Sequence, residues 1–277
     1  MTSVFTADVS MKIASLDASL ESAFWQRVNE DIPHYYFYAF DWKYNREKTK
    51  ILLALENKRI DGMMLVYDRR IAQLRGSSKA AEALLQKLDL EKVELQSLKE
   101  HKQLVLRKYK PTLRQSHEMT LMLLHKGEET PRARHPVLAL DTSSSEKIAA
   151  IIRDADPEYW GDVTCQGILD GFSKGAKWFG VRGNGELVSI GMLRLTEWIG
   201  LIGVVATQET HRNQGCATSV VSHLVGCILE KLPAAMIYVL ADNSPAIRAY
   251  TKVGFKPYRT YFFMRGEKHQ KHETPPS

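Results

Sequence analysis

Cysteine is scarce in this chain, with three among 277 residues. Cys165, Cys216 and Cys227 form no CxxC pair and no cluster with histidine at metal-ligand spacing. This pattern excludes a disulfide framework and a structural zinc site from our expectations. Free thiols suit a reducing compartment, so we expect a cytoplasmic protein that holds no metal.

Long apolar runs are also missing. Residues 1–10 lack a basic segment followed by an apolar stretch, and no uninterrupted apolar run could span a bilayer. We therefore expect neither secretion nor membrane insertion. The formal net charge of +6 comes from scattered lysines and arginines and a short basic tail. Without a recognisable nucleic-acid module, this charge predicts no nucleic-acid partner.

The composition that remains is typical of a folded globular protein, with 44% hydrophobic and 25% charged residues. The length suits two domains. Residues 126–146 combine glycine, two prolines, charges and serines, which indicates a boundary. We expect an accessory α/β domain over residues 1–130, a second domain over 141–266 and a flexible tail over 267–277.

Apolar periodicity predicts alternating helices and strands in the second half. Gly183, Asn184 and Gly185 predict a hairpin turn between two strands. The expected helices cover 147–154, 162–173, 216–232 and 245–253, and the expected strands cover 176–182, 186–195, 199–207, 235–240 and 258–265. This order, α-α-β-β-β-α-β-α-β, indicates an α/β fold with a mixed sheet.

The first motif follows the strand over 199–207. Arg212, Gly215 and Ala217 have the spacing RxxGxA directly before a long helix. Small residues leave backbone amides unobstructed there, and the dipole of the helix favours an anion such as a pyrophosphate. Taken alone, so short a spacing also fits an ordinary helix start.

The second motif lies downstream, again between a strand and a helix. Asn243, Ala246, Tyr250, Gly254 and Phe255 fit the pattern NxxAxxxYxxxGF. With both motifs, residues 145–265 resemble the GNAT superfamily of acyl-CoA N-acyltransferases, and especially its glycine N-acyltransferase-like branch. The resemblance implies a GNAT fold in this half and acetyl-CoA as the acyl donor.

The resemblance also implies which residues hold that donor. In GNAT proteins the RxxGxA segment binds the CoA pyrophosphate through main-chain amides, and the preceding strand pairs with the pantetheine arm. Cofactor binding is therefore expected of Val205, Ala206, Thr207, Arg212, Asn213, Gln214, Gly215, Cys216, Ala217, Thr218, Asn243 and Tyr250.

Tyr250 matches the GNAT tyrosine that acts as general acid near the CoA sulfur, where a leaving thiolate benefits from a proton donor. The alternative is a packed helix tyrosine. Attack also requires a neutral amine, and Glu197, near the join of two strands, is the expected base. Glu209 and His211 rank behind it, although such residues are more often solvated loop charges.

Two further residues have alternative interpretations. Cys216 stands at a helix N-terminus, which can lower the pKa of a thiol and permit an acetyl-cysteine intermediate. We expect direct attack in a ternary complex instead. Trp160 could line the acceptor pocket, although a tryptophan there more often simply packs.

The first half repeats part of this order. Strand-like runs over 50–55, 62–67 and 71–74 precede Arg75 and a helix that continues through Leu90. If Arg75 is aligned with Arg212, Ser78 takes the place of Gly215. This predicts a tandem pair of GNAT-like folds.

The later part of the first half supports the same alignment. Setting Tyr109 against Tyr250 places Lys102 at the Asn243 position, and residues 119–124 match the last strand of the second half. We expect a degenerate first copy that binds CoA poorly and shapes the acceptor cleft. The aromatic run over 33–38 could wall that cleft, although such a run is more often core.

The expected function is an acetyl-CoA-dependent N-acetyltransferase, an acyltransferase for groups other than aminoacyl groups, acting on a primary amine. A small-molecule amine is the favoured acceptor, and a protein or peptide amine is the alternative within the enzyme class. The rival from another class is a noncatalytic acyl-CoA-binding regulatory module, which would have no use for Tyr250. The chain could also form a homodimer.

Overall fold

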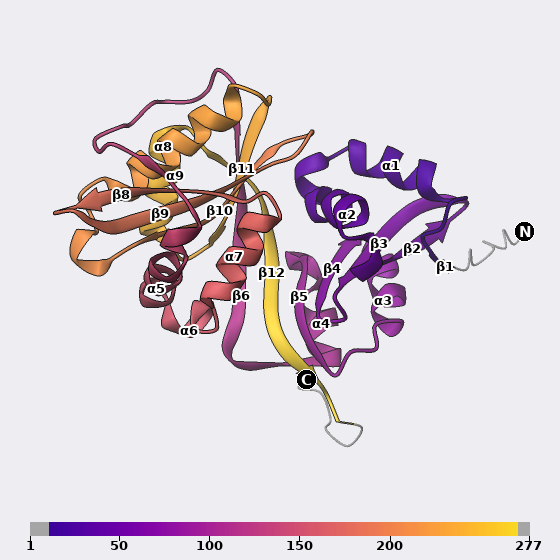
Figure 1. The fold of residues 1–277 in the computed structure, drawn as a ribbon. Helices are drawn as coiled ribbons and strands as arrows, with labels where there is room; N and C mark the ends of the chain where they lie inside the picture. Colours follow the sequence, from indigo (N-terminus) through magenta and orange to yellow (C-terminus); the bar gives the residue numbers. More distant parts are fainter. Residues whose placement is uncertain (1–10, 271–277) are drawn as a thin grey trace, which may run out of the picture. The chain divides into compact units, whose positions relative to one another are not determined.

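The computed structural model describes residues 11–270, apart from the side chains of residues 113 and 114. Within this range the chain forms two compact units: unit 1 comprises residues 11–118 and 260–270, and unit 2 comprises residues 119–259. Both are mixed sheets covered by helices, which confirms the predicted α/β class (Figure 1). Residues 271–277 of the predicted tail lie outside the described residues.

Unit 1 is an antiparallel meander that continues into a parallel pair of strands. Its elements are β1 (Lys12–Ser15), α1 (Glu21–Asn29), α2 (Ile32–Tyr44), η1 (Arg46–Lys48), β2 (Thr49–Glu56), β3 (Arg59–Tyr67), β4 (Ile71–Gly76), α3 (Ser78–Gln86), β5 (Lys92–Leu98), η2 (Lys99–His101), α4 (Lys102–Lys108), the first part of β6 (Tyr109–His125) and the last part of β12 (Lys256–Lys268). Asn57 and Lys58, both at positive φ, form the tight turn between β2 and β3. The strand order is β1-β2-β3-β4-β5-β12.

Unit 2 repeats this plan. Its elements are the second part of β6, β7 (Leu138–Leu140), η3 (Thr142–Ser144), α5 (Ser145–Ala155), α6 (Pro157–Trp160), α7 (Cys165–Ser173), β8 (Lys177–Gly183), β9 (Glu186–Leu195), β10 (Gly200–Thr207), η4 (Glu209–His211), α8 (Cys216–Leu229), β11 (Ala234–Leu240), α9 (Ser244–Val253) and the first part of β12. The strand order is β6-β11-β10-β9-β8-β7. Only β10 and β11 pair in parallel among the strand pairs described for this unit.

The terminal strands of the two sequence halves are exchanged. Residues 119–125 of β6 pair with β11 in unit 2, whereas the end of β12, beginning at Tyr261, pairs with β5 in unit 1. The two units therefore differ from the predicted domains, which kept residues 119–124 in the first half and 258–265 in the second. Both strands are apolar enough to complete either sheet, so the local pattern could not assign them.

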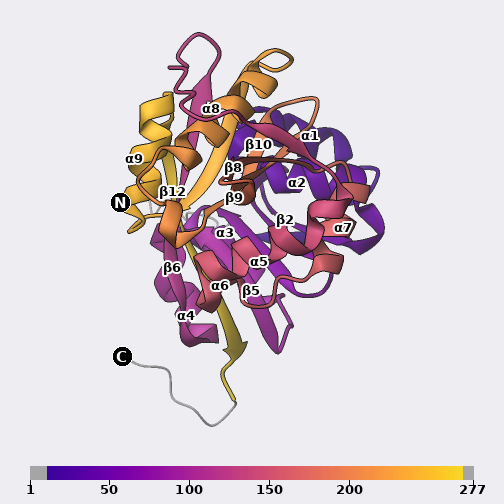
Figure 2. The same cartoon turned by 60° about the vertical axis from the view of Figure 1, so that its left-hand side comes forward.

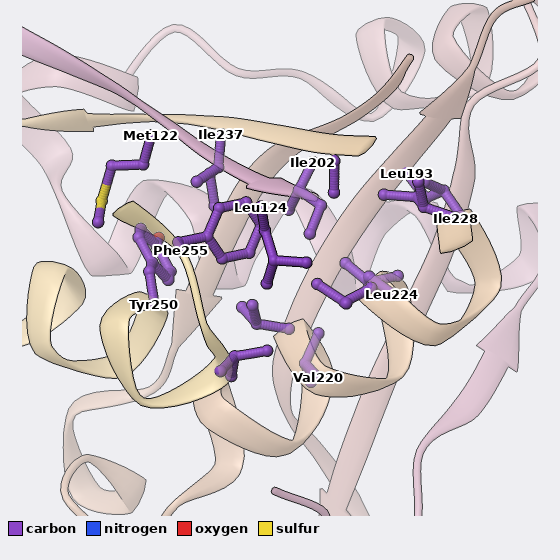
Figure 3. Packing of buried hydrophobic residues seen from close by; sticks show 14 of the residues in the cluster. Met122, Leu124, Leu193, Ile202, Val220, Leu224, Ile228, Ile237, Tyr250 and Phe255 are labelled. Carbon is purple, nitrogen blue, oxygen red and sulfur yellow. The ribbon is translucent and has the colours of Figure 1, made fainter. Parts of the chain in front are cut away.

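The sheet of unit 2 carries helices on both faces. A Cβ atom on Gly191 would lie 2.6 Å from Val220 of α8, whereas the adjacent Ile190 packs with α5. Because alternate residues of a strand face opposite sides, α8 and α9 cover one face and α5 covers the other. The core beneath α8 and α9 is drawn in Figure 3, and Figure 2 shows α5, α6 and α7 grouped together.

Most predicted elements of the second half are confirmed, and β9 has the predicted bounds. Asn184 and Gly185 both have positive φ, as the predicted hairpin turn requires. The prediction missed β7 and α6. The side chain of Asp156 accepts a hydrogen bond from the Tyr159 amide and so begins α6, whereas the sequence indicated only the end of the preceding helix there.

Residues 11–270 contain neither a candidate membrane-spanning helix nor a candidate metal-binding group. None of the helices there is long and apolar enough to cross a membrane. No group of three or more histidine, cysteine, aspartate and glutamate side chains in that range is placed to hold a metal ion.

Candidate functional site

The two parallel strands of unit 2, β10 and β11, are paired over only part of their length. β10 and β11 pair at three positions, ending with Ile202 opposite Ile237. The register of β10 against β9 then shifts between Ile202 and Val205, which marks a bulge at residues 203–204. A Cβ atom on Gly203 would lie 2.3 Å from the Cε atom of Met192, so a larger residue here would require the flexible end of that side chain to move.

The bulge leaves one edge of β10 without a strand partner. Val205, Ala206 and Thr207 pair with β9 on one side, and within the described residues they form no ladder with β11 on the other. An unpaired strand edge offers alternating N–H and C=O groups to any extended polar chain. These are the three strand residues that the sequence assigned to the pantetheine arm.

The segment after β10 forms a backbone cradle at the start of α8. Asn213 and Gly215 have positive φ values of 63° and 88°, which turn the chain sharply into the helix. Gly215 is the N-cap residue, and no side chain caps the helix. The first N–H groups of a helix have no partner within it, so they remain available to an anion. Gln214, Cys216, Ala217 and Thr218 complete the segment, as predicted from the motif.

Arg212 does not direct its side chain into this cradle. Its Nε donates to the carbonyl oxygen of Thr207 at 3.4 Å, and a terminal nitrogen donates to that of Ala155 at 3.3 Å. The guanidinium therefore ties the end of β10 to the end of α5.

The second motif lies on α9. Asn243 caps this helix, because its Oδ1 accepts a hydrogen bond from the Ala246 amide at 3.1 Å. The side-chain NH₂ group retains its donors, so a contact with a ligand is compatible with the cap. Gly254 ends the helix at a φ of 118°. Both conserve the geometry that the NxxAxxxYxxxGF spacing predicts.

Tyr250 lies at the edge of the core. Its side chain packs with Phe255, with ring centroids 6.3 Å apart, and Figure 3 shows it beside Phe255 and Met122. Burial raises the pKa of Tyr250 well above that of an ordinary tyrosine, so the phenol stays protonated at neutral pH. This state is the one that a hydrogen-bond donor requires.

Cys216 gives no sign of nucleophilic activation. It is buried in the core beneath α8 and α9, and burial raises the pKa of its thiol. A raised pKa disfavours the thiolate that an acetyl-cysteine route would need. Here the apolar surroundings outweigh the helix N-terminus, in agreement with the preference for direct attack.

The predicted base is not brought near the cradle. Glu197 is exposed in the turn before β10, whereas the cradle follows the other end of that strand. The two ends of β10 are seven residue steps apart, which corresponds to roughly 23 Å of extended chain. Glu209 and His211 lie nearer, in η4, and Trp160 packs at the edge of the core beneath α5. The identity of a base stays a prediction.

A segment that the sequence indicated only as a domain boundary also reaches the cradle. The Cδ atom of Arg134 lies 3.1 Å from the point that a Cβ atom on Gly215 would occupy. The ring Nε2 of His135 lies 2.8 Å from the carbonyl oxygen of Gln214. The two residues precede the cradle by some eighty positions, and no local pattern in the sequence reveals this proximity.

The matching place in unit 1 is closed by its own residues. α3 begins directly after β4, and its N-cap Ser77 accepts a hydrogen bond from the Ala80 amide at 3.2 Å. Asp61 accepts a hydrogen bond from the hydroxyl of Ser77, which brings a carboxylate to this helix start. Ser77, rather than the predicted Ser78, is thus the counterpart of the N-cap Gly215.

Arg75 is fully buried in unit 1. It lies inside β4 and is 0% exposed, whereas Arg212 lies in an exposed loop, so the predicted alignment of these two arginines does not hold in space. Its guanidinium donates to the main-chain oxygen of Gln96 at 3.3 Å and lies 4.3 Å from the ring centroid of Tyr261.

The aromatic run over 33–38 belongs to α2, and most of its side chains are buried in unit 1. The hydroxyl of Tyr38 donates to main-chain oxygens of Met63 and Gln73. This run therefore contributes to the core, which was the commoner of its two predicted interpretations.

A known protein family matches the region that contains both motifs. The sequence model of the FR47-like protein family matches residues 179–264, which contain the bulge, the cradle and α9. Mycothiol acetyltransferase from Streptomyces bingchenggensis is 31% identical over an alignment of 119 residues that covers 39% of this chain and 37% of the relative. The match therefore spans well under half of that relative's length.

Solved structures share the fold over nearly the whole chain. A tandem GNAT protein from the clavulanic acid biosynthesis pathway superposes with a TM-score of 0.54 at 12% identity, over 95% of this chain and 100% of the other. This chain therefore has a tandem GNAT-like fold, and its FR47-like match lies in the second half. The predicted tandem of GNAT-like halves is confirmed, while the glycine N-acyltransferase-like branch stays a prediction.

Two further structures show how widely this GNAT arrangement extends. A GNAT-family acetyltransferase from Colwellia psychrerythraea has a TM-score of 0.53 at 15% identity, covering 93% of this chain and 100% of that one. A Drosophila protein solved by a structural genomics consortium has a TM-score of 0.68 at 9% identity, covering 92% and 99%. At such identities the likeness establishes the GNAT fold alone.

Proposed function

We propose that unit 2 is an acetyl-CoA-dependent N-acetyltransferase that acts on a primary amine by direct attack in a ternary complex. The observation that carries this proposal is the parting of β10 from β11 after Ile202, which leads directly to the uncapped start of α8. An extended arm with a pyrophosphate at one end matches that sequence of features: a free strand edge, then an anion cradle.

The residues of the cradle fit a phosphorylated donor. Gly215 has no side chain, and those of Ala217 and Thr218 are small, so a phosphate can approach the amides at the start of α8. The strand residues Val205 and Thr207 present main-chain groups along the unpaired edge of β10. Bound acetyl-CoA would supply the acetyl thioester.

Tyr250 is proposed as the general acid. Its buried phenol can donate a hydrogen bond to the sulfur as negative charge develops there. A phenol is a weaker acid than a thiol, so this donor stabilises the charge more than it transfers the proton. Since burial raises the pKa of Tyr250, its deprotonation should not limit activity below about pH 10.

The acceptor is proposed to be a small-molecule amine, because the additional, degenerate unit 1 is expected to shape an acceptor cleft. The similarity to a mycothiol acetyltransferase favours acetyl as the transferred group. A protein or peptide amine, and a noncatalytic acyl-CoA-binding module, are the alternatives that the test must separate.

Thiol release from acetyl-CoA with a panel of amines tests this proposal. With the best amine, Tyr250→Phe should lower kcat by about 100-fold, while acetyl-CoA affinity changes by less than about twofold. The matched control is Tyr109→Phe in unit 1, because Tyr109 is also buried and is the tyrosine predicted to correspond to Tyr250.

Each alternative has its own signature. Unchanged acetyl transfer by Tyr250→Phe would remove the acid assignment. Acetyl-CoA binding with no thiol release on any small amine, protein or peptide would favour the noncatalytic module. Release only with proteins or peptides would reassign the acceptor class.

A further inference from the structure

The segment after β6 is fastened along α8 and α9 by its own backbone. The Arg132 amide donates to the hydroxyl of Ser222 at 2.9 Å, and the Thr130 amide donates to the carbonyl oxygen of Val253 at 2.8 Å. The Arg134 amide donates to the hydroxyl of Ser219 at 3.0 Å. Figure 1 shows this segment as a loop beside α8, and these bonds make it part of unit 2.

Ser219 links this segment to the cradle. Its side chain is 0% exposed, and its hydroxyl accepts from the amides of Arg134 and His135 while donating to the carbonyl oxygen of Gly215 at 3.0 Å. One buried hydroxyl thus sets the position of the loop backbone relative to Gly215. A polar group that is buried and fully used holds its neighbours in one arrangement.

The loop backbone places the Arg134 side chain against Gly215, beside the point where any other residue would carry its Cβ atom. Its Cδ atom makes the close approach of 3.1 Å described above, and the guanidinium begins one bond beyond Cδ, so it lies near Gly215. Replacing glycine at this position would push the arginine away. Gly215 therefore serves two purposes, since it turns the chain and also makes room for Arg134.

Arg212 and Arg132, the arginines nearest in sequence to the cradle and to Arg134, form hydrogen bonds with main-chain oxygens instead. Arg212 is engaged by two carbonyl oxygens, and Arg132 directs its Nε towards the carbonyl oxygen of Lys252 at 3.5 Å. A guanidinium adds a full positive charge to the amide dipoles and binds phosphate oxygens with strong, directional hydrogen bonds.

We propose that Arg134, from the segment between the two halves of the sequence, supplies the side-chain cation that contacts the pyrophosphate of acetyl-CoA. This assignment rests on the proposed function of unit 2. It makes Arg134 a determinant of cofactor binding that lies outside both motifs.

Binding of acetyl-CoA to the full-length chain, measured by isothermal titration calorimetry, tests the assignment. Arg134→Ala should raise Kd about tenfold, because a charge-assisted hydrogen bond is lost. The change leaves the Arg134 backbone amide on Ser219 intact, so the loop should stay in place. Arg132→Ala is the matched control, with the same charge change two residues away, and should alter Kd by less than about twofold.

Two analogues locate the contact. S-acetyl-pantetheine, which has the arm without phosphates, should bind wild type and Arg134→Ala equally. Acetyl-dephospho-CoA, which lacks the 3′-phosphate but keeps the pyrophosphate, should show the full tenfold loss. The wild-type Kd should also rise more steeply with salt than that of Arg134→Ala.

Three results would overturn the assignment. These are equal losses in the two arginine variants, no loss beyond twofold in Arg134→Ala, or a loss that disappears with the dephospho analogue. If wild type itself failed to bind acetyl-CoA, the proposed function would fail instead, so the two failures are distinguishable.

Discussion

The two units use the same strand-to-helix turn and finish it in opposite ways. In unit 1, β4 ends at Gly76 and α3 begins at Ser78, and Ser77 caps the helix with its own hydroxyl. In unit 2, residues 208–215 separate β10 from α8, and no side chain caps that helix. One helix start is satisfied within the protein, and the other leaves its amides for a ligand.

The strands before these two turns also differ, because β10 has a bulge and β4 has none. β4 pairs with β5 up to Leu74 without a bulge, and the buried Arg75 bonds across to Gln96. β10 leaves β11 after Ile202 through a bulge. A GNAT-like topology therefore does not make a cofactor site by itself. In unit 2 the unpaired strand edge leads to a helix start without a side-chain cap, whereas in unit 1 Ser77 caps the helix that follows.

Gly215→Asp should have the largest effect on this contrast. It places a carboxylate in the cradle, as Asp61 does at the matching helix of unit 1, and should weaken acetyl-CoA binding by at least about 100-fold through like-charge repulsion. Calorimetry provides the affinity. The matched control is Gly175→Asp, because Gly175 has a φ of 81° with nothing within 4 Å of its Cβ position. Retained affinity in Gly215→Asp would contradict the cradle.

Arg75→Ala should produce the next largest effect, and on stability. It leaves the oxygens of Gln96 without their donor and empties a buried volume, so the free energy of unfolding should fall by about 3 kcal/mol. Arg212→Ala, at an exposed position, should cost less than about 1 kcal/mol. Urea denaturation measures both.

The two arginines differ for ligand binding as well. Under conditions where Arg75→Ala remains folded, its acetyl-CoA affinity should match that of wild type, because Arg75 belongs to unit 1. A weaker affinity would show that unit 1 takes part in holding the cofactor.

The smallest effect separates the two helix caps. Ser77→Ala and Asn243→Ala each remove an N-cap acceptor and should each cost about 1 kcal/mol of unfolding free energy. Only Asn243→Ala should also weaken acetyl-CoA binding, by about threefold to tenfold, through the loss of its amide donors. Equal effects on affinity would leave Asn243 as a cap alone.

Much of the fold could be predicted because local chemistry decides it. Asn184 and Gly185 accept positive φ, so the hairpin between β8 and β9 was predictable from two residues. The apolar spacing of α8 and the ends of α9, from Asn243 to Gly254, were equally accessible. The cradle was found for the same reason, since its glycine and its place before a helix are local features.

What could not be predicted depends on partners distant in the sequence. Tyr261 lies against Arg75 and bonds through its hydroxyl to His34, which is 227 positions away, so only the folded unit reveals where the end of β12 belongs. The bulge at 203–204 lies beside Met192 on the neighbouring strand, a contact that the local sequence does not reveal. Arg134 reaches the cradle through Ser219, which no motif includes.

The exchanged strand has a consequence for how the protein is made. The chain returns to unit 1 only at residue 260, so a ribosome has synthesised all of unit 2 before the last strand of unit 1 exists. Unit 2, although second in the sequence, can finish folding first. Until the final residues emerge, β5 presents an open edge in the nascent chain, and protecting it from aggregation becomes a task for chaperones.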